Sequence, residues 1–323
     1  MARKEWCGGE PFALEPKLTL DIPRARTHAG GAQGSMIQGE PRLGRGQTLK
    51  GCLGVTVPGV VGFLGFGTMG QAIARGLILA RAIAPSEVLT YDVDASKAEA
   101  AKALGGSAAL SADELARASQ TLLLAPKPQD MRGALESLKG GLRHDALVIS
   151  IAAGVSIRFI QDVLGAQTRV IRAMPNTPAM VGAGATAFAR SKTCTDQDAH
   201  VARTIFEAIG VAEDVPEELL DAITALSGSG PAHYFALVEA QTRAGVGLGL
   251  PEAQAGRLAG QTLYGAGLLL HESGESAATL RARVTSKGGT TAAALEVFEA
   301  RGLADVVSAG MTAAAKRSRQ LGQ

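Results

Sequence analysis

The sequence lacks the features that mark several large protein classes. Of its 323 residues, 4% are aromatic and 19% are charged, and Lys plus Arg outnumber Asp plus Glu by only 32 to 30. Nucleic-acid binding usually requires a dense basic surface, so we expect no nucleic-acid partner. Gly, Pro or charged residues interrupt every apolar stretch before it reaches the roughly 18 to 20 residues of a membrane helix, so we expect no membrane span.

Cysteine and histidine are also scarce. Cys7, Cys52 and Cys194 are too few and too scattered for a disulfide framework or a zinc cluster. We therefore expect no metal site and a reducing, cytoplasmic setting. The five histidines, at positions 28, 144, 200, 233 and 271, form no His/Asp pair for acid–base chemistry. With 46% apolar residues, the chain is long enough for two domains.

Residues 1–58 are predicted to form a disordered N-terminal extension. They contain Gly pairs and several prolines, and no apolar period long enough for an element. A targeting peptide is disfavoured because the segment carries four early acidic residues and no apolar central run. It is then either a tail or the product of an upstream start codon.

From residue 59 onward, short apolar runs alternate with Ala- and Leu-rich helical stretches, which is typical of a parallel α/β sheet. The expected buried strands are Gly59 to Leu64, Val88 to Tyr91, Thr121 to Ala125, Ala146 to Ile151 and Arg169 to Met174. The expected crossover helices are Met69 to Ala82, Ser96 to Leu104, Asp113 to Arg117 and Gln129 to Leu138.

After Pro216 the strand signals stop. Long Ala/Leu-rich segments predict an all-helical domain over 216–323, with helices near 217–227, 231–246, 251–271, 276–283, 289–300 and 303–320. Helices rich in small residues can approach closely, and a helical domain with few aromatic residues often completes its core across a subunit interface. We therefore expect a homodimer or a higher homo-oligomer.

A glycine-rich turn follows the first expected strand and precedes a helix. It consists of Gly65, Phe66, Gly67, Thr68, Met69 and Gly70. In this GxGxxG pattern the first glycine permits the turn, the second lets a pyrophosphate approach, and the third allows close packing of helix and strand. The phosphates would then face the helix N-terminus. The alternative is a plain glycine turn.

Asp92 closes the second expected strand, 22 residues beyond Gly70. An acid at this place usually accepts hydrogen bonds from the adenosine ribose of NAD and repels a 2′-phosphate, which favours NADH. Lys97 lies just beyond and offers a cation for a phosphate, so the choice between NADH and NADPH stays open. Asp92 is otherwise only a cap for the next helix.

Three further loops leave the carboxyl ends of expected strands, where α/β proteins bind ligands. Prolines on either side of Lys127 and of the Asn176–Thr177 pair fix the direction of these polar residues, although Pro also simply terminates strands. Small residues in the third loop would let a flat ring lie against the backbone. The cofactor-binding candidates from these loops are Ala125, Pro126, Lys127, Pro128, Ala152, Ala153, Gly154 and Asn176.

The helical half contains two segments rich in Gly and hydroxyl residues, at 227–231 and 285–291. In the second, successive glycine amides and Ser and Thr hydroxyls precede a helix, a combination that suits a carboxylate or a phosphate. The alternative is a capped turn between two helices.

From about residue 59 to the C-terminus, the sequence resembles the pyrroline-5-carboxylate reductase family. The motifs that carry the resemblance are GFGTMG at 65–70, KPQ at 127–129, MPNTP at 174–178, LSGSGPA at 226–232 and VTSKGGTT at 284–291. The resemblance implies a Rossmann-type NAD(P)-binding domain over 59–215 and an all-helical substrate-binding and dimerisation domain over 216–323. It also implies reduction of a cyclic imine to L-proline by NADPH or NADH, in a site completed by the partner's helical domain.

The resemblance also implies a role for each matching residue. Ser286, Gly288, Gly289, Thr290 and Thr291 would hold the substrate carboxylate, and the Thr291 hydroxyl would lie near the ring nitrogen as the candidate catalytic group. The glycine turn would take the pyrophosphate, and the three strand-end loops would position the nicotinamide. The sequence departs from the family pattern at Lys287, where proline is commonest, at His233, where an aromatic is frequent, and at Pro126, where valine is usual.

Two other functions compete with this reading. A hydroxyacid dehydrogenase of the same two-domain architecture would need a base in the helical domain, for which the sequence offers no clear Lys-plus-Asn helix pattern. A non-catalytic dinucleotide-binding sensor would keep the glycine turn but would have no use for the hydroxyl-rich loop at 285–291.

Overall fold

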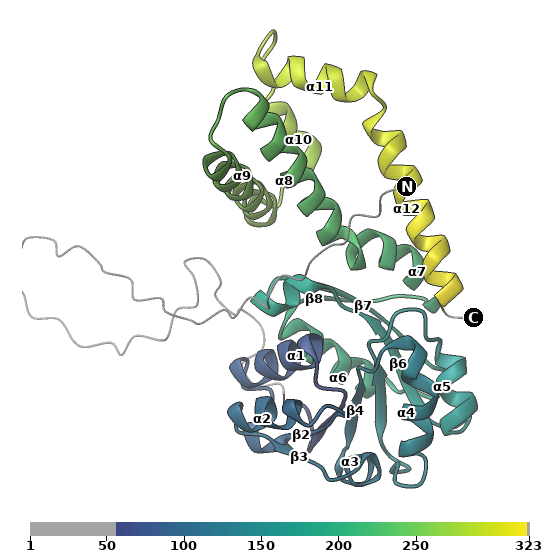
Figure 1. Ribbon diagram of the computed structural model, residues 1–323. Coiled ribbons are helices and arrows are strands. Elements are labelled where there is room, and N and C mark those ends of the chain that lie inside the picture. The colour runs from purple at the N-terminus through teal and green to yellow at the C-terminus, as the bar shows by residue number, and fades with distance from the viewer. Residues whose placement is uncertain (1–55, 322–323) are drawn as a thin grey trace, which may run out of the picture. The chain divides into compact units, whose positions relative to one another are not determined.

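The computed structural model describes residues 56–321, so nearly all of the expected 1–58 extension lies outside the described residues. The first half contains one eight-stranded sheet (Figure 1). Its strands are β1 Val61–Leu64, β2 Val88–Tyr91, β3 Ser107–Ala108, β4 Thr121–Leu124, β5 Leu147–Ser150, β6 Arg169–Met174, β7 Gly184–Arg190 and β8 Gly210–Asp214. All five expected strands are present, with ends within two residues of those predicted.

The strand order is β3-β2-β1-β4-β5-β6-β7-β8. Neighbouring strands are parallel except β6 and β7, which pair antiparallel. The chain reverses its order between β3 and β4, so β1 and β4 lie side by side at the centre. Ligands of open α/β sheets bind at the carboxyl ends of strands at such a switch point.

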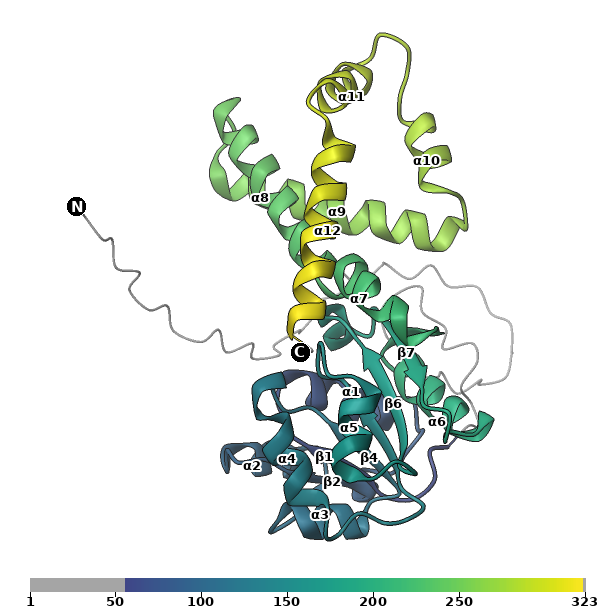
Figure 2. The ribbon, with the colours of Figure 1, turned by 90° about the vertical axis from the view of Figure 1, so that its right-hand side faces the viewer.

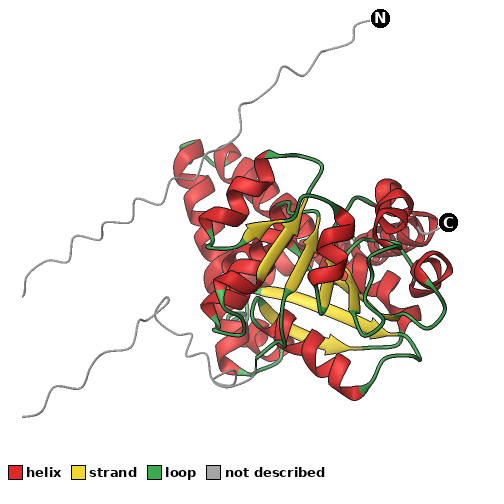
Figure 3. Ribbon diagram, turned by 90° about the horizontal axis from the view of Figure 1, so that it is seen from below, coloured by secondary structure: helices red, strands yellow, loops and turns green. Residues whose placement is uncertain are grey.

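Helices cover both faces of the sheet, as the view from below shows (Figure 3). They are α1 Thr68–Leu79, α2 Ser96–Ala103, α3 Ala112–Ala118, α4 Met131–Leu138, α5 Ile157–Leu164 and α6 Asp196–Glu207. Ser111, Ser156 and Thr195 cap α3, α5 and α6 through hydrogen bonds to backbone amides of the first turn. The α/β class predicted from the sequence is confirmed, whereas α5 and α6 were not among the predicted helices.

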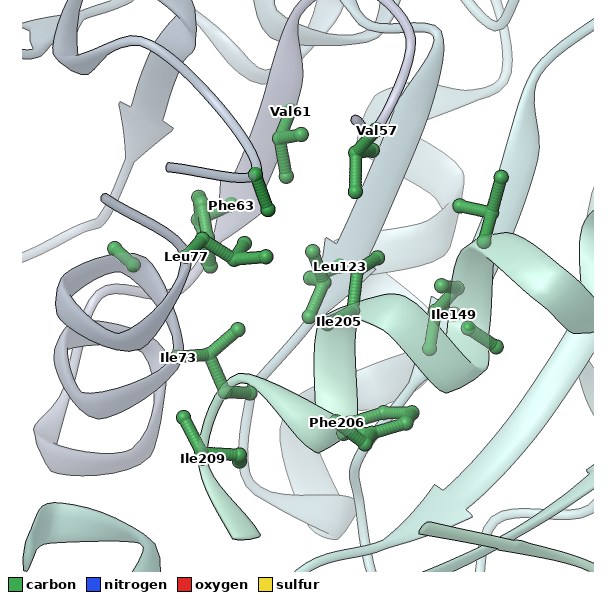
Figure 4. Close-up of a cluster of buried hydrophobic side chains, with 14 of the residues drawn as sticks. Val57, Val61, Phe63, Ile73, Leu77, Leu123, Ile149, Ile205, Phe206 and Ile209 are labelled. Carbon is green, nitrogen blue, oxygen red and sulfur yellow. The ribbon is translucent and has the colours of Figure 1, made fainter. Parts of the chain in front are cut away.

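Two apolar layers form the core, one on each face of the sheet. Ile73 and Leu77 of α1 and Ile205 and Phe206 of α6 point toward side chains of the central strands (Figure 4). Helices α3, α4 and α5 pack on the opposite face with the alternate strand residues, which are Leu122, Leu124 and Val148 among others. Because both faces are covered, the strands are continuous apolar runs rather than alternating ones.

Between residue 216 and residue 321 the described chain contains helices and turns but no strand, as predicted. The elements are the short 3-10 helix η4 Glu217–Leu219, α7 Leu220–Ile223, the π-helix η5 Thr224–Gly228, α8 Gly230–Gly247, α9 Glu252–Ser273, α10 Ala277–Arg283, α11 Thr290–Ala300 and α12 Leu303–Leu321. The C-terminal half of α12 lies beside α7 in two perpendicular views (Figures 1 and 2). No helix among the described residues is long and apolar enough to cross a membrane.

A buried arginine connects the sheet to the helical segment. Arg172 of β6 contacts the carboxylates of Glu217 and Asp221, each at 3.4 Å. The Ser318 hydroxyl of α12 donates to Asp221 at 2.7 Å, and the Ile157 N–H at the start of α5 donates to Glu217 at 2.9 Å. This group of side chains therefore ties β6, α5, α7 and α12 together.

Candidate active site

The three glycines of the turn after β1 meet different steric demands. Gly65 has φ +85°, and a Cβ there would lie 3.0 Å from the carbonyl carbon of Ala125. A Cβ on Gly70 would lie 3.1 Å from the Gly65 carbonyl oxygen. Over Gly67, by contrast, no atom lies within 4 Å of the place a Cβ would take. The outer glycines allow close packing, and the middle one leaves open space beside the N-terminus of α1.

A cavity of about 220 Å³ lies at this turn. Its lining residues are Gly67, Thr68, Met69, Gly70, Ala125, Ile151 and Pro175. Helix α1 has no side-chain cap and no acidic residue in its first turn, so its leading amides are available to an anion. Open space, free amides and the positive end of a helix dipole together suit a pyrophosphate.

Five of these lining residues were predicted from the sequence for the cofactor site, and Ile151 and Pro175 were not. Ile151 directly precedes the predicted Ala152–Gly154 segment, and Pro175 directly precedes Asn176. Both residues directly follow a buried strand. Their position at the carboxyl end of a strand is the signal from which a place in the cofactor site could have been predicted. Phe66, which was predicted for the cofactor site, directs its ring into the core against Phe63, with the ring centroids 5.4 Å apart.

Asp92 is bound to the glycine turn. Its Oδ2 accepts the Phe66 N–H at 2.7 Å, and its Oδ1 accepts the Asp94 N–H at 2.9 Å. At the start of α2 it is Asp94, rather than Asp92, that accepts the Ser96 N–H. The geometry therefore places the Asp92 carboxylate beside the turn and does not use it as the cap of α2.

The cation nearest to Asp92 in the sequence already has a partner. Lys97 Nζ lies 3.3 Å from Asp94 Oδ2. Hydrogen bonds from the Ser96 side chain and amide, together with Lys97, hold the pKa of Asp94 below its ordinary value. The β2–α2 loop thus contains two carboxylates, Asp92 and Asp94, and the lysine that pairs with Asp94 lies in the first turn of α2.

The remaining strand-end loops lie close to the turn or form its wall. The Ala125 N–H donates to the Leu64 carbonyl at 2.8 Å, which keeps this loop against the end of β1. Lys127 is exposed, whereas Pro126 and Pro128 are half-buried. In the loop after β5, Ala152 and Gly154 are buried, and Gly154 has φ +78°.

The loop at 285–291 begins α11 in the helical segment. Gly288 has φ +71°, and Gly289 is the N-cap of α11 without any side-chain cap, so the first amides of this helix are open to an anion. Ser286 and Thr290 are exposed, and Thr291 is half-buried. The residues that line the cavity at the glycine turn all belong to the α/β half, so within the described chain this loop does not line it.

The helical segment leaves large apolar side chains exposed. On α8, Tyr234 and Phe235 are 58% and 59% exposed, and on α9, Leu258 and Tyr264 are 60% and 65% exposed. Exposed apolar patches are typical of surfaces that bind other molecules. Among residues 56–321, no group of three or more His, Cys, Asp or Glu side chains is placed to hold a metal ion.

Comparisons with known proteins match both halves of the chain. Residues 217–321 match the family described as pyrroline-5-carboxylate reductase dimerisation, and residues 60–154 match the family described as NADP oxidoreductase coenzyme F420-dependent. The chain is 41% identical to a pyrroline-5-carboxylate reductase from Synechocystis, over 81% of this chain and 98% of the relative.

Two solved structures are similar over nearly their whole length. One is a pyrroline-5-carboxylate reductase from Coxiella burnetii, with a TM-score of 0.78, 34% identity and coverage of 82% of this chain and 99% of the other. The second is the Plasmodium falciparum pyrroline carboxylate reductase with NADP bound, with a TM-score of 0.73, 28% identity and coverage of 83% and 100%.

Proposed function

The chain belongs to the pyrroline-5-carboxylate reductase family, and from this premise we propose how its own residues carry out the reaction. The enzyme reduces the cyclic imine of L-1-pyrroline-5-carboxylate to L-proline, the last step of proline biosynthesis. The observation that carries the proposal is the open space over Gly67 beside the uncapped N-terminus of α1, together with the uncapped start of α11 at the 285–291 loop.

The residues around the glycine turn fit a nicotinamide dinucleotide. When bound, NADPH or NADH supplies the hydride. The amides of α1 and the turn at 65–70 hold the pyrophosphate, and Asp92 holds the adenosine ribose hydroxyls. Ala125 to Pro128, the backbone of Ala152 to Gly154 and the Asn176 loop form the walls of the nicotinamide site. We propose that these contacts fix the cofactor and exclude water.

The loop at 285–291 holds the substrate in this proposal. Ser286, Gly288, Gly289, Thr290 and Thr291 bind the carboxylate through hydroxyls and through the open amides at the start of α11. The Thr291 hydroxyl then hydrogen-bonds the ring nitrogen and orients the C=N carbon. A protonated cyclic imine accepts hydride directly, so alignment of donor and acceptor is the main catalytic device. No His/Asp pair is required for this step.

The active site is proposed to contain parts of two subunits. The protein is a homo-oligomer through its dimerisation segment, and we propose a homodimer as its minimum. Two observations support completion of each site by the partner: the 285–291 loop does not line the cavity within the described chain, and apolar side chains of α8 and α9 are exposed. We further propose that the enzyme works in the cytoplasm, where nicotinamide cofactors and reduced cysteines coexist.

An absorbance assay separates the proposed activity from its competitors. We expect oxidation of NADPH or NADH when pyrroline-5-carboxylate is added, with stoichiometric formation of proline. A hydroxyacid dehydrogenase would turn over a hydroxyacid with the oxidised cofactor instead. A sensor would bind the dinucleotide tightly without turnover of either substrate, and that result would refute the proposal.

A further inference from the structure

The Asn176 side chain is enclosed, and both ends of its amide are engaged. The residue is 8% exposed and follows Pro175, which lines the cavity at the glycine turn. Its Oδ1 accepts the Ala185 N–H at 2.9 Å, and its Nδ2 donates to the Ser227 carbonyl at 3.1 Å. The first partner belongs to β7, and the second belongs to the π-helix η5 of the helical segment. One amide therefore joins three separate parts of the chain.

The Asn176 side chain makes these contacts instead of the local capping hydrogen bond that is usual at its position. It is the N-cap of the short 3-10 helix η3 Thr177–Val181, yet its side chain forms no capping hydrogen bond there. Asn at an N-cap ordinarily accepts a hydrogen bond from an amide two or three residues ahead. Here its partners lie 9 and 51 residues away. The side chain is thus committed to long-range contacts.

The π-helix that Asn176 contacts lies directly against the end of β6. A Cβ on Gly228 would come within 2.6 Å of the methyl group at the end of the Met174 side chain, so η5 and β6 are in close contact here. The Ser229 N–H closes this turn on the Thr224 carbonyl at 2.8 Å, and α8 begins at Gly230. Single π-turns are rare and often lie at functional sites. Asn176 and Met174 together hold η5 against the end of β6.

We propose that Asn176 is a positioning residue for hydride transfer. Its amide connects the loop at the nicotinamide site to η5, which leads into α8 of the dimerisation segment. It thereby sets how the partner's substrate loop meets the cofactor. This inference rests on the proposed function. A misplacement of about 1 Å costs roughly a hundredfold in rate even when its cause lies far from the reacting atoms. Variants of Asn176 should therefore lower turnover more than cofactor affinity.

Two variants test the amide donor. Asn176→Asp preserves size and the acceptor for Ala185, but an ionised carboxylate repels the Ser227 carbonyl; Asn176→Leu removes both hydrogen bonds. We expect each variant to lose about tenfold or more in turnover at pH 8, while the dissociation constants of NADH and NADPH, measured by fluorescence, change less than about twofold. Gln161→Leu removes the two hydrogen bonds of another side-chain amide, which is half-buried and donates to the Thr168 carbonyl and the Thr193 hydroxyl; it is the matched control and should retain the wild-type turnover.

A pH series distinguishes positioning from general damage to the fold. A protonated carboxyl can donate to the Ser227 carbonyl, and enclosure at this 8% exposed position raises the pKa of a carboxyl above its ordinary value. The turnover of Asn176→Asp relative to wild type should therefore rise as the pH falls from 8 to 5.5. The ratio for Asn176→Leu should stay low throughout. Dividing the turnover of the variant by that of the wild type at each pH removes the effect of every ionisation that the two proteins share. Should Asn176→Asp fail to fold, Asn176→Ser is compared by the same split between turnover and cofactor affinity.

Several results would overturn the inference. Loss of cofactor affinity in parallel with turnover would mean that the amide touches the cofactor, and a ratio for Asn176→Asp that is independent of pH would remove the role of the donor. Wild-type turnover in both variants would remove any role of Asn176. The wild-type assay is separate from these comparisons: an inactive wild type contradicts the proposed function, whereas an active wild type with unaffected variants contradicts only this inference.

Discussion

The Phe66 N–H donates to Asp92 Oδ2 at 2.7 Å, so the acid at the end of β2 is held against the glycine turn at the end of β1. The two residues are 26 positions apart in the sequence. Their hydrogen bond fixes the carboxylate where the adenosine ribose of a dinucleotide lies in Rossmann-type sites. The same bond makes Asp92 part of the turn's own structure.

Replacement of Asp92 should change the choice of cofactor. Asp92→Asn keeps an acceptor for the Phe66 N–H but removes the negative charge. We expect NADH to bind about tenfold more weakly, because hydrogen bonds to a charged acceptor are the stronger ones, and NADPH to bind equally well or better. Dissociation constants for both cofactors provide the measurement. An unchanged ratio of the two affinities would limit Asp92 to supporting the turn.

Gly67→Ala should separate cofactor binding from stability. Because no atom lies within 4 Å of the added methyl group and φ is −71°, the melting temperature should stay at the wild-type value. The methyl group occupies the space left for the pyrophosphate, so both dinucleotides should bind at least about tenfold more weakly. Unchanged affinity would show that the phosphates lie elsewhere.

Gly65→Ala is the contrasting variant in the same turn. Its φ of +85° and the Ala125 carbonyl 3.0 Å from the added carbon both oppose a side chain. We expect a loss of about 1–3 kcal/mol in the free energy of unfolding, measured by denaturant titration. Equal stability of the Gly65 and Gly67 variants would contradict the different roles assigned to these glycines.

Thr291→Ala should lower turnover of pyrroline-5-carboxylate by about tenfold to a hundredfold, because it removes a hydrogen bond to a charged substrate. Cofactor affinity should be unchanged. Thr285→Ala in the same loop is the matched control, because the Thr285 hydroxyl is already used by the Arg281 carbonyl at 2.6 Å. Equal losses in the two variants would assign the effect to the loop rather than to Thr291.

Removal of the buried Arg172 should destabilise the protein. Arg172→Ala leaves Glu217 without its cation and Asp221 with only Arg319, at 3.9 Å, and we expect a loss of about 3 kcal/mol in the free energy of unfolding. The exposed pair of Arg117 and Asp113 gives the control, and Arg117→Ala should leave the unfolding transition unchanged. A small effect at Arg172 would mean that β6 and α7 are held together by other contacts.

The central strands of the sheet were easier to predict from the sequence than the strands towards its edges. The strands with uninterrupted Val, Ile and Leu were found because burial on both faces leaves that pattern in the residues. Strand β7 is Ala-rich and β3 has only two residues, so neither has a strong pattern of its own. Their conformation depends on pairing with neighbouring strands.

The site was predictable where function depends on backbone shape. The glycine turn could be predicted because only glycine fits at position 65 and because the residue at position 67 must leave space for the pyrophosphate. The partners of Asn176 and the position of the Asp92 carboxylate could not be predicted. The hydrogen bond from Asn176 to Ser227 joins residues 51 positions apart, and the one from Phe66 to Asp92 joins residues 26 positions apart. Such pairs are set by the folded arrangement of strands and leave no local signal.

We propose that the glycine turn of one subunit and the 285–291 loop of another form one active site. The most direct test mixes Gly67→Val, which blocks the cofactor cradle, with Thr291→Ala, after each has been shown to be nearly inactive alone. In a mixed dimer, one site combines an intact turn with an intact loop from the partner. Random mixing should therefore restore about a quarter of the wild-type turnover. Turnover no higher than that of the two separate variants would contradict a site shared between subunits.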